Sequence, residues 1–159
     1  MKLLPHFFTG MVAVLAGCKP VTSPDRLINA KASLPHTFKL SELHQKVITS
    51  FITNSTHTTS ILYGNAEAYA ADTASHPVHA LGQSFTLITW RQQDDAHWFG
   101  ARIPGNLISA ETLTITGKAD AIEYNYQRLL GKNLVKLADT TGNAARVKYI
   151  LSQKAFITP

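Results

Sequence analysis

The segment Gln83–Gly105, with the sequence QSFTLITWRQQDDAHWFGARIPG, decides the fold that we expect for this chain. In its first half, up to Trp90, the side chains of Phe85, Leu87 and Thr89 alternate with those of Thr86, Ile88 and Trp90. This alternation and the high content of β-branched and aromatic residues are typical of a strand. A polar break follows at residues 91–96, and a second short run ends at Pro104-Gly105. Two strand-like runs around a polar break predict an antiparallel hairpin, and this hairpin carries both tryptophans of the chain.

Further strands are expected on both sides of this hairpin. Period-two alternation or β-branched content predicts them at residues 46–53, 60–63, 108–116, 121–130 and 134–138. The segment 121–130 is also compatible with a helix. We favour a strand there because Ile122, Tyr124 and Tyr126 share one face in period two.

Two short helices complete the predicted architecture. The alanine-rich segment 66–73 follows Asn65, a good N-cap residue. Apolar side chains recur at helical spacing in residues 144–155, and Asn143 is the expected N-cap of this second helix. The sum is an α+β fold, in which an antiparallel sheet of five to seven strands carries one or two short helices.

Composition limits the class of protein. The chain of 159 residues has room for one domain, and its 45% hydrophobic and 16% charged residues suit a packed core. The net charge of +5 comes from lysines and arginines that are scattered along the chain. Because the sequence has neither a basic stripe nor a zinc-finger or RRM motif, we expect no nucleic-acid partner.

The start of the chain carries the clearest motif. A short positive start is followed by an apolar stretch, residues 3–17, which is shorter than the ~20 residues that a membrane-spanning helix needs. The stretch leads into residues 15–18 (LAGC), which resemble the lipobox of bacterial lipoproteins. This resemblance implies cleavage before Cys18 and acylation of its sulfur and of its new amino group, and several acyl chains anchor a protein stably. An ordinary signal peptide or a short membrane helix with a chance cysteine is the alternative.

The lipobox sets the expected organisation of the chain. Residues 1–17 are a lipoprotein signal peptide, residues 18–35 are the lipidated Cys18 with a flexible tether rich in proline and serine, and residues 36–159 are a single domain. Lys19, in place of an aspartate, follows the cysteine. By resemblance to lipoprotein sorting, this implies the outer membrane, with the domain facing the periplasm. Cys18 is the sole cysteine, so no intramolecular disulfide can form.

Three pieces of the domain resemble a known family. They are residues 61–65 (ILYGN), residues 86–90 with 94–104 (DDAHWFGARIP), and the helix at residues 144–155. Together they resemble small bacterial envelope proteins with a cytochrome P-460-like domain, over about residues 45–156. The resemblance implies a compact sheet with a cavity on one face. Haem-bearing members attach c-type haem through Cys-x-x-Cys-His, which this sequence lacks, so covalent haem is excluded and no haem ligand can be carried over.

The densest polar cluster is the candidate site. His97 can ligate a metal or haem iron or act as a base, Trp90 and Trp98 can line an apolar pocket, and Arg102 can pair with a carboxylate. The structural alternative is that Asp94 and the residues after it form a turn, that the tryptophans pack across the strand pair, and that Arg102 makes a surface salt bridge.

The sequence thus predicts a lipid-anchored periplasmic lipoprotein that acts as a small-ligand or protein-binding module and not as an enzyme. Its expected partners are the membrane, through the lipid on Cys18, and a small molecule or an envelope protein. One alternative is a redox enzyme or haem carrier with non-covalent haem on His97. Another is a structural envelope protein whose hairpin surface docks a partner.

Overall fold

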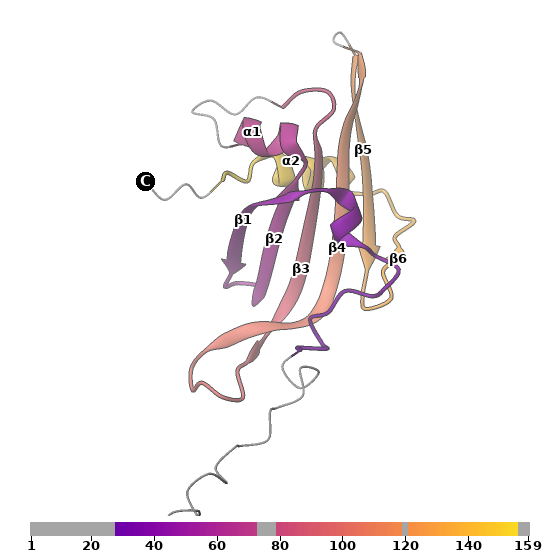
Figure 1. The fold of residues 1–159 in the computed structure, drawn as a ribbon. Helices are drawn as coiled ribbons and strands as arrows, with labels where there is room; N and C mark the ends of the chain where they lie inside the picture. The colour runs from indigo at the N-terminus through magenta and orange to yellow at the C-terminus, as the bar shows by residue number, and fades with distance from the viewer. Residues whose placement is uncertain (1–27, 73–78, 119–120, 156–159) are drawn as a thin grey trace, which may run out of the picture.

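The computed structural model describes residues 28–72, 79–118 and 121–155. Six strands form one antiparallel sheet in the order of the chain, so each strand pairs with its sequence neighbours (Figure 1). The strands are β1 (Lys46–Thr53), β2 (Thr58–Gly64), β3 (Ser84–Asp94), β4 (Arg102–Lys118), β5 (Ala121–Leu130) and β6 (Val135–Lys136). The helices are the 3-10 turn η2 (Leu40–Leu43), α1 (Ala66–Asp72) and α2 (Asn143–Leu151). The prediction of an antiparallel sheet with few helices is confirmed, although the sheet dominates.

The central hairpin forms as predicted, but its strands are longer than expected. β3 and β4 pair from Ser84 and Thr114 down to Asp94 and Arg102. The prediction that Pro104-Gly105 separates two strands is wrong, because β4 runs through both residues. Register shifts on either side of Trp90 absorb the irregularity, as β-bulges do. Gly105 allows close approach of the two backbones, since a Cβ atom there would lie 2.9 Å from the carbonyl oxygen of Arg91.

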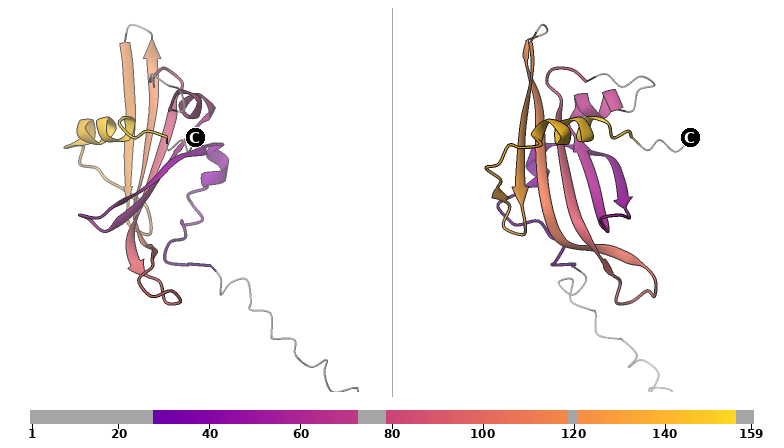
Figure 2. Two further views of the ribbon diagram at one scale, coloured as in Figure 1. Left: turned by 90° about the vertical axis from the view of Figure 1, so that its left-hand side faces the viewer. Right: turned by 180° about the vertical axis from the view of Figure 1, so that it is seen from behind.

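The two faces of the sheet have separate cores. α2 lies across one face, which we call the helix face, and the segment 28–43 covers part of the other (Figure 2). α1 lies at the end of β2, where the chain leaves the sheet (Figure 1). The helix-face core consists of Ile48, Leu62, Ala68, Phe85, Leu87, Leu113, Ile115 and Ile150. Ile150 anchors α2 to this core, as its apolar spacing predicted.

The opposite face packs under residues that the sequence assigned to the tether. Ala32 and Leu34 pack against a core cluster that contains Trp90. The indole Nε1 of Trp90 donates a hydrogen bond to the carbonyl oxygen of Ala32 at 2.8 Å, and Asn29 Nδ2 donates to that of Pro104 at 2.7 Å. Residues 29–34 therefore belong to the folded domain. Cys18 and residues 1–17, the expected signal peptide, lie outside the described residues.

The helix ends show which capping predictions hold. Asn65 Oδ1 accepts a hydrogen bond from the backbone N–H of Ala68 at 3.1 Å, as expected of an N-cap. At α2 the N-cap is Gly142, with a φ of 83°, and Asn143 is the first helical residue, so that prediction is wrong. A glycine tolerates this left-handed conformation without steric cost. None of the described helices is long and apolar enough to cross a membrane.

Candidate functional site

The structure separates the two tryptophans of the predicted site. Trp90 is 6% exposed in the core opposite the helix face, whereas Trp98 is 72% exposed on the loop between β3 and β4. His97 is exposed on the same loop. Arg102 begins β4, and its Nε lies 3.7 Å from Asp94 Oδ1 in an exposed ion pair. The rings of Trp90 and Trp98 therefore do not form two walls of one pocket.

The acidic pair before His97 has the geometry of a turn. Asp95 Oδ1 accepts a hydrogen bond from the backbone N–H of His97 at 2.7 Å, which is the local bonding that favours aspartate in turns. The turn and the exposed Arg102–Asp94 ion pair match the structural alternative, whereas Trp98 is 72% exposed and does not pack against Trp90 across the strand pair. Within residues 28–72, 79–118 and 121–155, no three His, Cys, Asp or Glu side chains group as metal ligands. Ligand or haem binding at Trp90, His97, Trp98 and Arg102 stays a prediction.

A different cavity lies on the helix face. It has a volume of about 570 Å³, and we call it the arginine pocket. The face changes character along each strand: Leu62 gives way to Ser60 on β2, Leu87 to Thr89 on β3, and Leu113 to Glu111 and Ser109 on β4. The apolar ends form the core and the polar ends form the pocket. Its lining residues are Thr53, Ser55, Thr56, His57, Thr58, Ser60, Thr89, Arg91, Ile108, Ser109, Glu111, Arg128, Arg146 and Tyr149.

A buried carboxylate organises one wall of the arginine pocket. Glu111 is 1% exposed. Arg146 on α2 donates from Nε to Glu111 Oε2 and from Nη2 to Glu111 Oε1, each at 2.9 Å. Tyr126 Oη donates to Oε2 at 2.6 Å, and Ser109 Oγ donates to Oε1 at 3.3 Å. Such charge-assisted, bidentate bonding makes a buried carboxylate tolerable, because each of its oxygens keeps hydrogen-bond donors.

This network shifts the protonation equilibria of the groups that surround Glu111. Burial raises the pKa of Tyr126 well above its usual value of 10.0, and the hydrogen bond to Glu111 raises the pKa further. Burial alone would lower the pKa of Arg146, but its hydrogen bonds to Glu111 and the charge of that carboxylate raise the pKa overall. Tyr126 therefore remains a protonated donor and Arg146 a cation across the neutral pH range.

The pocket carries more positive than negative charge. Three arginines line it, Arg91, Arg128 and Arg146, against the single carboxylate of Glu111. Arg128 Nε lies 3.8 Å from Glu111 Oε1, which is too long for a hydrogen bond. This Nε is buried and has no hydrogen-bond partner in the described part of the chain. Arg146 makes the close bidentate contact with Glu111, whereas Arg128 lies only at ion-pair distance from it and Arg91 donates to the carbonyl oxygen of Thr56. The three guanidinium groups thus carry more positive charge than one carboxylate neutralises, and the excess is open to an anionic ligand.

Hydroxyl groups on neighbouring strands add further donors and acceptors to the arginine pocket. Ser60 Oγ and Thr89 Oγ1 lie 3.0 Å apart across β2 and β3, and Thr56 Oγ1 and Thr58 Oγ1 lie 2.9 Å apart at the β1–β2 turn. Each hydroxyl can donate one hydrogen bond and accept others. Guanidinium groups beside hydroxyls can bind the oxygens of a planar carboxylate or of a tetrahedral phosphate.

The sequence alone did not identify this pocket, because its charged residues stand singly on four elements. Arg91 lies on β3, Glu111 on β4, Arg128 on β5 and Arg146 on α2. A signal was present in the strands, where Ser60, Thr89, Ser109 and Glu111 occupy positions that share a face with core leucines. A polar residue at an inward position of a strand needs partners, and clusters of such positions indicate a site.

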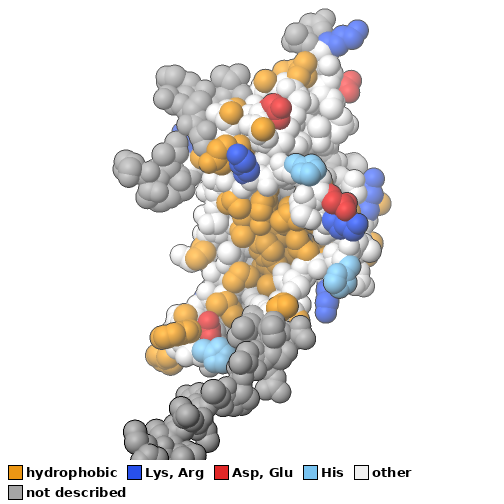
Figure 3. Space-filling model, in the orientation of Figure 1, with side chains coloured by type: hydrophobic (Ala, Val, Ile, Leu, Met, Phe, Trp, Pro, Cys, Tyr) orange, Lys and Arg blue, Asp and Glu red, His pale blue; other side chains and the backbone are white. Residues whose placement is uncertain are grey.

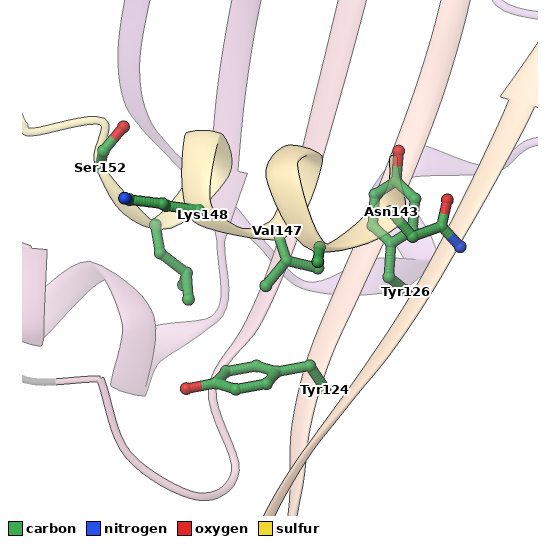
Figure 4. A pocket seen from close by; sticks show the side chains of 8 residues that line it. Tyr124, Tyr126, Asn143, Val147, Lys148 and Ser152 are labelled. Atoms are coloured by element: carbon green, nitrogen blue, oxygen red, sulfur yellow. The ribbon is translucent and has the colours of Figure 1, made fainter. Parts of the chain in front are cut away.

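A second cavity, of about 790 Å³, lies on the other flank of α2. Tyr124 projects from β5 beneath Val147 of the helix, and Tyr126, Asn143, Lys148 and Ser152 surround the same space (Figure 4). This apolar groove is lined by Tyr124, Tyr126, Asn143, Ala144, Val147, Lys148, Leu151 and Ser152. Tyr126 connects the two cavities, since it lines the groove and donates to Glu111.

Comparison with protein-family models gave no match, and comparison with curated proteins gave none either.

Proposed function

We propose that this chain is a lipid-anchored protein of a bacterial envelope whose domain binds a small anionic ligand in the arginine pocket. The anchor on Cys18, the outer membrane facing the periplasm and the cytochrome P-460-like character of the domain are predictions from sequence. The binding function is supported by one observation above all: two arginines line the pocket beyond the one that neutralises Glu111.

The state of Arg128 supports an anionic ligand. Its side chain is one-third exposed, so it is partly desolvated yet still reachable from the pocket. Its buried Nε lacks a hydrogen-bond partner in the described part of the chain, which leaves a donor whose desolvation is uncompensated. A ligand oxygen placed there gains a charge-assisted hydrogen bond and removes that cost.

The size and the polar lining of the pocket favour a small molecule. A volume of about 570 Å³ lies within the range of roughly 300–1,000 Å³ that small-ligand pockets occupy. Hydroxyls from four strands, β1 to β4, supply the directional contacts that orient a ligand. Small mono- or dicarboxylates and phosphate are the simplest compounds with matching charge.

The engagement of Glu111 supports a binding role over catalysis. A general base needs a carboxylate that is free to accept a substrate proton. Both oxygens of Glu111 already accept hydrogen bonds, from Arg146, Tyr126 and Ser109. The carboxylate therefore acts as a support that positions Arg146 in the wall of the pocket.

The binding proposal is tested by calorimetric titration of the mature chain, residues 18–159 with Cys18→Ser, using succinate and inorganic phosphate as probes. The Arg128→Gln variant is expected to weaken binding of at least one probe by about tenfold or more, because it removes a charge-assisted contact. Arg102→Gln is the matched control, since Arg102 is an exposed arginine outside the pocket. Binding that is absent for both probes, or that is equal in the two variants, contradicts the proposal.

The anchor is tested separately, by mass spectrometry of the amino terminus of the protein isolated from its native host. The expected species starts at Cys18 and carries acyl groups. An unprocessed, lipid-free amino terminus contradicts the anchor and leaves the pocket proposal untouched.

A further inference from the structure

The loop between β3 and β4 presents two large apolar side chains to solvent. Trp98 is 72% exposed and Phe99 is fully exposed. We call these two residues the aromatic tip. Hydrophobic side chains gather at the lower left of the molecule, over the end of the β3–β4 hairpin (Figure 3). Two adjacent aromatic side chains that are exposed to water are unfavourable, because burial of their apolar surface would stabilise the protein.

The chain enters the domain at the same end of the molecule. Asn29 donates to the carbonyl oxygen of Pro104, on the strand that leads from the aromatic tip, and Ala32 accepts from Trp90. Figures 1 and 2 show the start of the described chain beside the end from which the hairpin projects. Residue 28, the first described residue, is ten residue steps from Cys18. That stretch can span at most about 35 Å, so an acylated Cys18 keeps residue 28, and with it the end of the domain that carries the aromatic tip, within reach of the bilayer surface.

The charges around the aromatic tip are few and leave a small negative excess, two carboxylates against one arginine. Arg102 pairs with Asp94, and Asp95 bonds to the backbone of the loop. A loop of this kind lacks the cluster of basic residues that binds anionic headgroups. Tryptophan in contrast is enriched at the boundary between headgroups and acyl chains, where its ring is buried and its N–H stays hydrated.

We propose that Trp98 and Phe99 insert into the interface of the membrane that carries the acyl chains of Cys18. The domain is then held at two points, the lipid and the aromatic tip, and has a fixed orientation on the bilayer. The inference rests on the proposed lipid anchor. The lipid on Cys18 strengthens the contact of the aromatic tip with the membrane, because it holds the tip at a high effective concentration near the bilayer surface.

The single cysteine allows a direct test that does not depend on processing by the host. Residues 18–159 are coupled through the Cys18 thiol to maleimide lipid in vesicles of phosphatidylethanolamine and phosphatidylglycerol at three to one. Tryptophan emission is then recorded with and without acyl chains that carry bromine, which quenches nearby indoles. The Trp98→Phe variant gives the background from Trp90. Ile122→Ser is the matched control, because Ile122 is an exposed apolar residue that pairs with Gly117, at the far end of β4 from Arg102.

The proposal expects a shift of emission to shorter wavelength and quenching by bromine in the coupled chain. Both signals disappear in Trp98→Phe, weaken in Phe99→Ser and persist in Ile122→Ser. Emission that matches the uncoupled chain, with no quenching, overturns the proposal. Such a failure says nothing against acylation or against the arginine pocket, which mass spectrometry and titration measure on their own.

Discussion

Arg146 on α2 donates to both carboxylate oxygens of Glu111 on β4, at 2.9 Å each. This pair connects the helix to the sheet at the boundary between the core and the arginine pocket. Ile150 provides the apolar attachment of the same helix one turn further on. The position of α2, and with it the wall of the pocket, therefore depends on a buried ionic contact as well as on hydrophobic packing.

The first prediction concerns the stability that this pair supplies. Glu111→Gln leaves Arg146 without its counter-charge, and breaking a buried pair costs about 3–5 kcal/mol. Because Arg146 is 32% exposed and partly hydrated, we expect a loss of about 2–3 kcal/mol in the free energy of unfolding, measured with urea.

The matched control for the first prediction is an ion pair on the surface. Lys39 and Glu42 are 2.8 Å apart, but their side chains are 63% and 65% exposed. Glu42→Gln should therefore cost about 0.5 kcal/mol or less. If both substitutions cost the same, burial is not what gives the Glu111–Arg146 contact its strength.

The second prediction concerns Tyr126 and alkaline pH. Its pKa in the folded chain is raised above the usual 10.0, so folding is favoured by the protonated phenol. This contribution is fully present below pH 10 and is lost as the pH rises through the raised pKa. Tyr126→Phe removes the hydrogen bond to Glu111 and should cost about 1 kcal/mol at pH 7. The difference in the free energy of unfolding between the native chain and Tyr126→Phe should shrink when urea unfolding is repeated from pH 9 to pH 11. A constant difference contradicts a raised pKa for Tyr126.

The third prediction concerns Asp72 at the end of α1. Its carboxyl is buried and Oδ1 has no hydrogen-bond partner in the described part of the chain. Burial raises its pKa, partly offset by the charge of His79. The folded state thus holds the proton more tightly than the unfolded chain, and stability falls as the pH rises through the raised pKa. Asp72→Asn should unfold at a higher temperature than the native chain at pH 7, and the difference should narrow toward pH 3. An equal or lower melting temperature at pH 7 is the contrary result.

The fourth prediction concerns where the domain begins. A chain that starts at His36 lacks Ala32 and Leu34 and leaves the indole N–H of Trp90 without its acceptor. The lost hydrogen bond alone is worth about 1 kcal/mol, and the lost packing adds to it. This shortened chain should unfold at a lower urea concentration than a chain that starts at Lys19. Coincident unfolding curves mean that the domain begins where the sequence placed it.

The sequence predicted those parts of the fold that depend on local pattern. Residues 46–53 and 121–130 form β1 and β5 with the expected bounds, because side-chain alternation and turn residues specify strands locally. The prediction that a strand ends at Pro104-Gly105 is wrong. Proline lacks a backbone N–H and glycine lacks a side chain, and both residues are tolerated in β4 because the hairpin of β3 and β4 is bulged there, a feature that arises only when the two strands pair.

The candidate site was not predictable in the same way. Arg91, Arg128 and Arg146 meet Glu111 only after three neighbouring strands have paired in register and α2 has crossed the sheet. The cluster at residues 94–98 was conspicuous because its polar residues are adjacent in the chain, but local adjacency on a hairpin loop produces a turn. Ligand sites depend on contacts between distant segments, which spacing in the sequence does not reveal.

The central claim, that the arginine pocket binds a small anion, is tested most directly by mapping where an anion binds. Residues 18–159 with Cys18→Ser, labelled with nitrogen-15, are titrated with succinate and, in a separate sample, with inorganic phosphate, and followed by amide chemical shifts. With at least one of these probes we expect saturable shifts confined to the residues around the pocket, chiefly Ser60, Thr89, Ser109 and Arg128, and their loss in Arg128→Gln. Shifts that are absent there with both probes, or that are scattered over the surface and unchanged in the variant, would contradict the claim.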